Sequence, residues 1–558
     1  MMPRGSKRST SCLLAGCVLG LAGAGYGGQT LPNGIVLPDE WPPQIAELSR
    51  EPMPVPYLDA RPDVVPIDLG RQLFVDDFLV EQTTLTRTHH RTRYHPASPI
   101  LVPDRPWEHD AMQGKPKKAT SIVFGDGVWY DPADNLFKMW YMGSNLKRLC
   151  YATSTDGLNW VKPELDIVPG TNILLDQERD SGTVWLDHNE TDPARRFKMF
   201  TTVPRPEGDG FRPAIYYSAD GIDWGEPLIV GGGIGDRTTI FYNPFRERWI
   251  YSIRQLIEPW GRSRRYAECT DLVDGLANLG RLSRLWLTAD RFDPRNPNPG
   301  AHDTHPQLYN LDGVPYESLL VGLFTIWQGS SFPGVQKRNE VLVGYSRDGF
   351  HWDRPYRRPF AGVNEADGAW NWSNVQSCSS GCLVMGDTLY FYVSGRGRTG
   401  EPASTGLAVL RRDGFVSIDA GAEEGVLTTR PVIFTGRHLF VNVDCPAGLL
   451  TVEVLDRDGN VIAPFSKDDC VPLAVDRTLQ QVRWNDTDDL SALAGQPVRF
   501  RFHLRHGRLY AFWVSADASG ASGGYVAAGG PGFTSPRDTV GRAAYEAAAP
   551  LLRRGITP

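Results

Sequence analysis

The sequence has few cysteines, no excess of basic residues and, beyond its first residues, no long apolar run. Its 58 Lys and Arg against 65 Asp and Glu give a net charge of −7, which argues against nucleic acid as a partner. No later segment is long and apolar enough to span a membrane as a helix. The spacing of Cys and His fits no zinc template, so we expect no cofactor. A hydrophobic fraction of 41% is typical of a globular protein.

The N-terminus has the pattern of a targeting segment. Basic residues in the first eight positions precede a short apolar run over residues 13–24 that ends in small residues. This pattern predicts a secretory signal peptide over residues 1–28, and therefore a secreted or periplasmic protein. A lipobox-like stretch at residues 14–17 makes a lipoprotein anchored at Cys17 the alternative. The very short apolar run before Cys17 favours the simple signal peptide.

Six cysteines remain beyond the signal: Cys150, Cys269, Cys378, Cys382, Cys445 and Cys470. Export permits disulfides. We expect Cys445 and Cys470, in the same C-terminal region, to be close enough to bridge. The alternative is that all six are buried small apolar residues.

Aromatic residues, 11% of the chain with 16 Trp, recur in a repeated unit. In residues 128–160, aromatic and β-branched runs alternate with Asp, Gly, Pro and Asn turns, a pattern typical of short antiparallel strands. The unit ends in Ser-x-Asp-Gly-x-x-Trp, and its clear copies lie 64 and 128 residues apart. Clear or degenerate copies fall at residues 154–160, 218–224, 269–271, 346–352 and 412–415. Five units of four strands predict an all-β fold with a five-bladed β-propeller.

The rest of the chain divides by composition and period. We expect a Pro-rich extended arm over residues 29–69, the propeller over 70–430 and a β-sandwich over 431–515. The Gly- and Ala-rich tail, 516–558, is expected to be disordered apart from a short helix. Strands within 73–80 and 101–102 are expected to close the propeller ring.

Several segments resemble a known superfamily. FVDDFLVE (residues 74–81), PWE (106–108) and FKMWY…YATSTDGLNW (137–160) resemble secreted bacterial proteins related to the five-bladed arabinanases, levansucrases and invertases. Residues 437–462 and 489–512 resemble the sandwich that follows the propeller in those proteins. The resemblance implies an exported glycoside hydrolase acting on a poly- or oligosaccharide. The invertase-type Asn-Asp-Pro-Asn and Arg-Asp-Pro motifs are absent, so no catalytic residue is carried over from the family.

The repeat itself suggests catalytic candidates. Asp180, Asp236 and Asp303 each stand four residues before an equivalent strand block in three successive units, whereas the first unit has Phe124 there. Equal positions in a radial array should converge on one central pocket. Glycoside hydrolysis needs one protonated and one ionised carboxyl, and crowding separates their pKa values. The alternatives are that these groups cap turns or bind a structural cation in the channel.

A second row lies six residues before each turn serine. It contains Arg148, Arg212 and Glu340, which makes Glu340 a fourth catalytic candidate. The arginines, with Arg237, are suited to a carboxylated or sulfated sugar or, alternatively, to salt bridges between blades. Loop residues expected at the substrate rim are Trp107, Glu108, Asp110, His302, His305, Trp370 and Trp372. The two last tryptophans are equally suited to packing.

Three functional hypotheses follow. The first is a glycosidase, for which carboxylates on different blades favour an inverting outcome because they stand apart. The second is a non-catalytic carbohydrate-binding propeller. The third is a cell-surface structural or interaction protein, which would have an apolar plug in its channel. The sequence does not indicate an oligomeric state.

Overall fold

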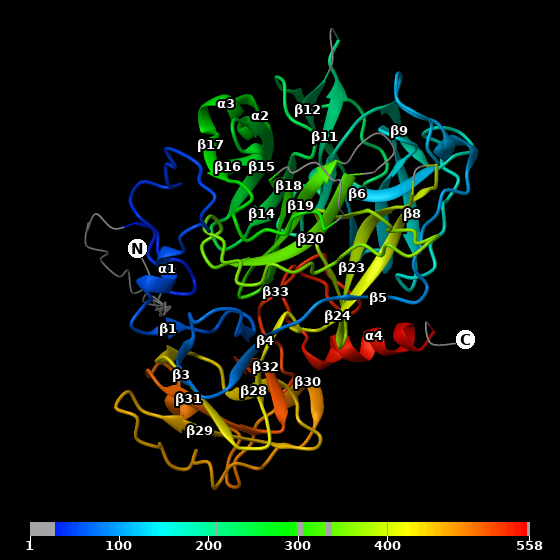
Figure 1. The fold of residues 1–558 in the computed structure, drawn as a ribbon. Helices are drawn as coiled ribbons and strands as arrows, with labels where there is room; N and C mark the ends of the chain where they lie inside the picture. The colour runs from blue at the N-terminus through cyan, green and yellow to red at the C-terminus, as the bar shows by residue number, and fades with distance from the viewer. Residues whose placement is uncertain (1–27, 207–209, 298–304, 331–336, 399, 555–558) are drawn as a thin grey trace, which may run out of the picture.

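The computed structural model describes residues 28–206, 210–297, 305–330, 337–398 and 400–554. It is built almost entirely of short β-strands (Figure 1). One group of sheets forms a five-bladed ring, and two further sheets pack as a separate sandwich below it. The expected all-β fold, a propeller followed by a β-sandwich, is confirmed.

Each of the first three blades is a four-stranded antiparallel meander. Blade one contains β6 (Thr120–Asp131), β7 (Leu136–Gly143), β8 (Lys147–Ser154) and β9 (Ile173–Glu178). Blade two contains β10 (Gly182–Leu186), β11 (Phe197–Pro204), β12 (Phe211–Ser218) and β13 (Ile229–Val230). Blade three contains β14 (Thr239–Asn243), β15 (Arg248–Ile257), β16 (Gly261–Cys269) and β17 (Arg284–Leu287).

The last two blades are less regular. Blade four contains β18 (Gln307–Glu317), β19 (Leu319–Ser330) and β20 (Lys337–Ser346). Isolated bridges take the place of its fourth strand. Blade five contains β21 (Asn374–Ser377), β22 (Leu383–Met385), β23 (Thr388–Arg396) and β24 (Ala403–Arg411).

N-terminal residues close the ring, although not all of those expected. Strand β5 (Arg93–Tyr94) pairs with β24, and Leu101 bridges to Thr405 of the same strand. The stretch 73–80, expected in this role, instead runs beside the sandwich: β2 (Gln72–Leu73) pairs with β32 (Gly507–Ser515). Strand character marks a segment as extended but does not identify its partner, so the closing pair was only partly predicted.

The repeated turns have a structural role. The carboxylate of Asp156 accepts hydrogen bonds from the amides of Leu158 and Asn159, both at 2.8 Å. Gly157 supplies the positive φ of +75° that the turn requires. Asp220 and Asp348 make the same bonds in blades two and four. These turns follow the third strands, at the ends opposite the cleft described below.

Blade three carries the degenerate copy. Helix α2 (Leu272–Ala277) follows β16 directly, where the other blades have their turn. Asp271 is its N-cap and accepts hydrogen bonds from the amides of Val273 and Asp274. The short helix α3 (Leu279–Leu282) completes this connection. The aspartate thus keeps its role in satisfying turn amides although the turn has become a helix.

The sandwich recruits strands from both sides of the propeller. One sheet contains β2, β4 (Thr86–His89), β25 (Val416–Ala420), β28 (His438–Asp444), β30 (Asp476–Gln481) and β32. The other contains β3 (Val80–Thr83), β26 (Gly425–Thr429), β29 (Leu449–Leu455) and β31 (Arg499–Arg505). Strands within 72–89 and 416–429, expected in the propeller, therefore belong to the sandwich sheets.

The Pro-rich arm lies against these sheets. It contains α1 (Pro56–Asp59) and β1 (Val65–Pro66), which pairs in parallel with β27 (Val432–Ile433). Leu31, Leu37 and Tyr57 from the arm are buried in the same core cluster as the sandwich strands. The arm is blue in Figure 1 and runs beside both parts of the molecule.

The C-terminal segment corrects the expectation of disorder. Strand β33 (Tyr525–Val526) pairs with β18, and α4 (Arg542–Arg554) packs near β22. Its glycines and alanines allow close approach: Ala528 and Ala548 are fully buried, and a Cβ on Gly530 would clash with the backbone of Val384. Small residues that looked like a disordered composition therefore serve dense packing.

The cysteines are all free thiols in the described part of the chain, and five of the six are buried. The Sγ of Cys445 lies 3.3 Å from the carbonyl oxygen of Leu473, and the Sγ of Cys470 accepts from the amide of Val452. The predicted disulfide is therefore not formed, and the alternative of buried apolar residues fits instead.

The expected signal peptide, including Cys17, lies almost wholly outside the described residues. Among the residues that are described, no helix is long and apolar enough to cross a membrane.

Candidate active site

A wide cleft lies on the propeller axis. All five blades contribute to its lining, with Phe124, Asp180, Asp236, Tyr309 and Gln376 each coming from or just before a first strand. Its volume is about 1140 Å³. Two of the carboxylates predicted from the repeat therefore do converge on one pocket, and they come from adjacent blades.

Asp180 is held just before β10 on the cleft wall. Its amide donates to Thr202 Oγ1 at 2.9 Å, and its Oδ1 accepts from the amide of Arg237 at 3.3 Å. Only 6% of the residue is exposed. Burial, followed by the neighbouring charge of Asp236, raises the pKa of Asp180 to about 6. This carboxyl therefore holds a proton more readily than an ordinary aspartate.

Asp236 has a different environment. Its Oδ1 lies 2.9 Å from Nη2 of Arg254, and 29% of its side chain is exposed. The two aspartates thus differ in their surroundings: Asp236 has an ion-pair partner, whereas Asp180 is buried and its pKa is raised. A carboxyl pair with unlike environments is what acid–base catalysis requires.

The floor beneath the pair is strained and charged. Phe124 and Arg237 have positive φ values of +48° and +57°, which are unfavourable for residues with a Cβ. The Arg237 guanidinium lies 4.1 Å from the centre of the Phe124 ring and is fully buried. Backbone strain of this kind concentrates at functional sites, where the surrounding packing enforces it.

Charged and polar side chains fill the channel below the floor. Arg179 forms a two-pronged ion pair with Asp126, and Ser377 donates to Asp312 at 2.7 Å. Burial raises the pKa of both Asp126 and Asp312. These residues do not form the apolar plug that is expected for a purely structural propeller.

A structural cation in the channel was the alternative role for the carboxylates. The described residues contain no group of three or more His, Cys, Asp or Glu side chains arranged to hold a metal. Arg179, Arg237 and Arg264 are all fully buried there. These guanidinium groups supply the positive charge that a cation would otherwise bring.

Glu340 is not on the cleft wall. Its carboxylate accepts from Gln328 Nε2 at 2.8 Å and from the amide of Val363 at 3.1 Å, and it lies 3.4 Å from Arg338. Strand β20 has ten residues where β8 and β12 have eight. Counting six residues back from the turn serine therefore stops inside β20, whereas its first residue, Lys337, is the one that lines the cleft.

Two of the predicted residues, His302 and Asp303, lie outside the described part of the chain. His305 is described and exposed; its Nδ1 lies 3.2 Å from Arg295. It does not line the axial cleft.

Glu108 and Trp107 belong to the structure of blade one. They lie in the short 3-10 helix η1 (Pro106–His109). Glu108 is fully buried, pairs with Lys162 at 2.7 Å and accepts from the hydroxyl of Tyr141. The indole of Trp107 donates to Asn172 at 2.9 Å. Both side chains are thus engaged in internal hydrogen bonds, and neither lines the axial cleft.

Arg148, one of the arginines predicted to bind substrate, is engaged in ion pairs within the protein. Arg148 forms ion pairs with Asp176 at 2.8 Å and Asp110 at 3.5 Å, which lie in blade one and in the loop that leads into it, and not in a neighbouring blade. The amide of Ala111 and the charge of Lys147 lower the pKa of Asp110 to about 2. Neither Arg148 nor Asp110 lines the cleft.

The other two predicted arginines, Arg212 and Arg237, have different surroundings. Arg212 follows the lining residue Phe211 on β12, so its side chain faces the other side of the strand. Arg237 contributes its amide to Asp180, and its side chain lies under the floor.

Trp370 and Trp372 pack against other side chains of the protein, which was the alternative to a role at the substrate rim. The Trp370 ring lies against Gly395 and Gly406 of blade five and makes an edge contact with Tyr94 at 5.4 Å. Trp372 lies under the guanidinium of Arg398 at 5.0 Å. Neither lines the axial cleft.

Several lining residues were missed by the sequence analysis. Lys118, Arg254, Lys337 and Arg396 bring positive charge to the cleft, and Asn374 brings an amide. All but Arg254, which lies inside β15, are at or near strand ends, where the repeat is irregular or the register depends on strand length. Only the first-strand positions, which repeat at a fixed spacing, carried a signal in the sequence.

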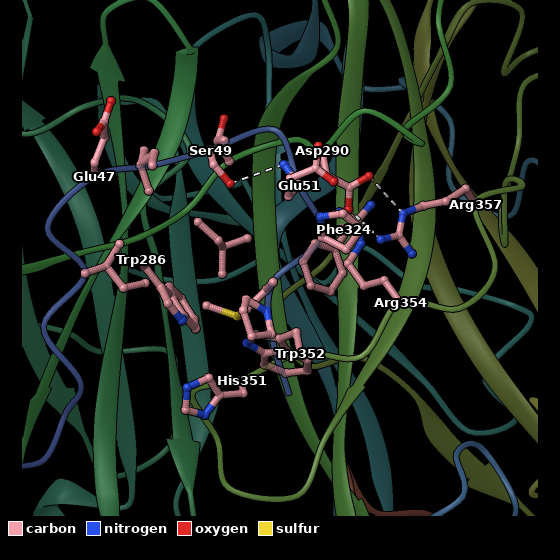
Figure 2. Close-up of a pocket in the computed structure, with 17 residues that line it drawn as sticks. Glu47, Ser49, Glu51, Trp286, Asp290, Phe324, His351, Trp352, Arg354 and Arg357 are labelled. Atoms are coloured by element: carbon pink, nitrogen blue, oxygen red, sulfur yellow. Dashed lines mark hydrogen bonds and ion pairs between the residues drawn. The ribbon is translucent and has the colours of Figure 1, made fainter. Parts of the chain in front are cut away.

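A second, smaller cavity of about 380 Å³ lies between the N-terminal arm and blades three and four (Figure 2). Trp286, Phe324 and Trp352 give it an aromatic wall. Its buried carboxylate, Asp290, is paired with Arg357 at 2.5 Å. Another carboxylate of the lining, Glu51, is paired with Arg291 at 2.8 Å. In the axial cleft, by contrast, Asp180 has a raised pKa and lies near a second carboxylate, so we take the axial cleft as the candidate active site.

Comparisons with known proteins add little beyond the strand arrangement. No family model matches the sequence, and no curated protein matches it. Similar solved structures include a fructofuranosidase from Schwanniomyces occidentalis, complexed with fructosylnystose (TM-score 0.35, 13% identity, covering 76% of this chain and 99% of that one). A thermostable family-43 glycoside hydrolase (0.35, 12%, 53% and 95%) and an endo-arabinase from Bacteroides thetaiotaomicron (0.34, 12%, 52% and 97%) are also similar. At these TM-scores the similarity carries no argument about activity.

Proposed function

We propose that this protein is an exported glycoside hydrolase that cleaves a poly- or oligosaccharide in the axial cleft. The observation that supports the proposal is the pair of carboxyls from adjacent blades, Asp180 and Asp236, in one solvent-open cleft. Burial raises the pKa of Asp180, and Asp236 is paired with Arg254. Export rests on the N-terminal signal pattern alone.

The environments suggest a role for each group. Asp180, whose pKa is raised to about 6, is the general acid that protonates the leaving glycosidic oxygen. Asp236, paired with Arg254, acts on the other side of the sugar, either on a water molecule or on the anomeric carbon. Activity that depends on this acid declines as the pH rises above about 6.

The stereochemical outcome follows from the separation of the two working carboxyls. A spacing of about 5–5.5 Å suits a retaining route, and roughly 6.5–9.5 Å leaves room for the water of an inverting one. Because the two groups come from different blades, we expect inversion. The anomer first released, followed by NMR before mutarotation, tests this expectation.

The competing function is a propeller that binds a carbohydrate without cleaving it. The cleft lining contains the aromatic rings of Phe124, Phe211 and Tyr309, on which a sugar ring could stack without being cleaved. A panel of polysaccharides, assayed for release of reducing ends, separates the two. We expect one polymer to be cleaved by the wild type and not by Asp180→Asn. Binding without any release in the whole panel would favour the competing function.

A further inference from the structure

The charges that line the axial cleft do not balance. The described lining contains three carboxylates and six cations. The carboxylates are Glu178, Asp180 and Asp236, and the cations are Lys115, Lys118, Arg205, Arg254, Lys337 and Arg396. Arg254 is neutralised by Asp236, so the excess positive charge lies elsewhere in the cleft.

Three of these cations lie at or near the ends of strands in neighbouring blades. Lys118 lies two residues before β6, Lys337 is the first residue of β20, and Arg396 is the last residue of β23. Across blades four, five and one, β20 pairs with β21, β21 with β23, β23 with β24, and β24 with β6. The three cations therefore face the carboxylate pair, which comes from blades two and three.

Lys118 and Arg396 are half-buried and Lys337 is exposed. Among the described residues, none of the three side chains has an ion-pair partner, although buried lysines elsewhere do. Lys138, for example, lies 2.7 Å from Asp131. Burial, followed by the nearby charge of Arg396, lowers the pKa of Lys118 to about 8, and burial also lowers the pKa of Arg396. Cations that are partly withdrawn from water and have no ion-pair partner become more favourable when an anion neutralises them.

Building on the proposed function, we propose that the glycan cleaved here carries an anionic group, either a uronate carboxylate or a sulfate ester. Lys118, Lys337 and Arg396 bind that group. A guanidinium can donate two parallel hydrogen bonds to either anion, and the lysines add charge. Asn374 and Gln376, from the same side of the cleft, add amide donors. The subsite lies across the cleft from the carboxylate pair, which keeps the substrate's charge away from Asp180 and Asp236.

Matched pairs of substrates test the proposal. One pair is a uronate polymer and the same polymer with its carboxyls reduced to alcohols; the other is a sulfated polymer and its desulfated form. We expect kcat/KM to be at least about tenfold higher on one anionic form than on its neutral counterpart. The pair that shows this difference identifies the anion. Equal values within both pairs would overturn the proposal.

Variants assign the effect to the residues. Arg396→Gln should raise KM on the preferred anionic substrate by about tenfold or more, with kcat within about threefold. On the neutral counterpart it should change neither value. Lys117→Met is the matched control, because it removes a neighbouring exposed charge outside the cleft lining. An equal loss on charged and neutral substrates would show that Arg396 serves the fold rather than the anion.

A binding measurement separates failure of this proposal from failure of the proposed function. Asp180→Asn, which should not cleave, is titrated calorimetrically with uronate and sulfated oligosaccharides. Binding that Arg396→Gln, added to this variant, abolishes would support the anion subsite even if no polymer is hydrolysed. If neither oligosaccharide binds, the anion subsite is wrong, whatever the enzyme cleaves.

Discussion

At the residue scale, Asp180 carries a cost to stability that follows from its role. Its pKa of about 6 in the folded state lies above the ordinary aspartate value of 3.8, so the folded state holds a proton that the unfolded state has already released between these pH values. Stability therefore falls as pH rises through this window. We expect Asp180→Asn to raise the free energy of unfolding by about 1–3 kcal/mol at pH 7.

Urea denaturation at two pH values checks this prediction. The gain of Asp180→Asn should be present at pH 7 and nearly absent at pH 4, because the wild-type carboxyl is protonated in the folded state at the lower pH. A variant that is less stable than the wild type at pH 7 would contradict a raised pKa for Asp180.

Glu340 provides the opposite case. Its carboxylate bonds to Gln328 and the amide of Val363 and lies outside the cleft. Glu340→Gln should leave kcat within about threefold while lowering stability by about 1–3 kcal/mol, because one charge-assisted acceptor is lost. Steady-state kinetics and denaturation of the same preparation measure both quantities. A hundredfold loss in kcat at unchanged stability would show that Glu340 is needed for catalysis.

The sequence predicted Asp180 and Asp236 in one pocket because their positions repeat at fixed spacing before first strands. It misplaced Glu340 because strand length in blade four differs. It missed Lys118 and Arg396 because their proximity depends on pairing between strands that are distant in sequence. The repeat in the sequence therefore predicted the residues on its regular part. The positions of the other residues depend on the pairing of strands that are distant in sequence.

At the element scale, the repeated turns should matter for stability and not for chemistry. Asp156 accepts two backbone hydrogen bonds and one from Asn159 Nδ2, at the end of blade one away from the cleft. Asp156→Ala should lower the free energy of unfolding by about 1–3 kcal/mol, since these donors lose their acceptor. Hydrolysis by the folded variant should equal that of the wild type at a permissive temperature. A selective loss of kcat would assign the turn a role in the reaction.

The elements themselves were predictable to the extent that they are local. The strands and their turns follow from alternating aromatic runs, and the five-fold repeat gives the ring. The assignment of 72–89 and 416–429 to the sandwich did not follow, because a strand's apolar face fits either sheet until tertiary packing decides. The ordered C-terminal segment was missed because small residues indicate disorder by composition and close packing only in context.

At the scale of the whole molecule, a buried ionic network joins the propeller to the sandwich. Arg71, fully buried, donates to Asp413 and to the carbonyl of Thr478, both at 2.8 Å, and lies 3.4 Å from Glu317. Arg71→Met leaves two buried carboxylates with reduced compensation. It should cost about 3–5 kcal/mol of stability.

A surface pair is the control for this prediction. Lys467 and Glu424 lie 2.6 Å apart and are both exposed, so Lys467→Met should cost less than about 1 kcal/mol. Thermal unfolding of both variants compares them. Equal small losses would mean that the network contributes little to holding the two parts together.

The central claim is that the carboxylate pair on the propeller axis hydrolyses a glycan. Asp236→Asn tests it most directly, because the substitution keeps the volume of the side chain and removes only its charge. On the polymer identified by the panel, we expect release of reducing ends to fall by about 10²–10⁴-fold, with thermal unfolding showing an intact fold. Cleavage by this variant at the wild-type rate would show that Asp236 is not catalytic and that the site has been misassigned.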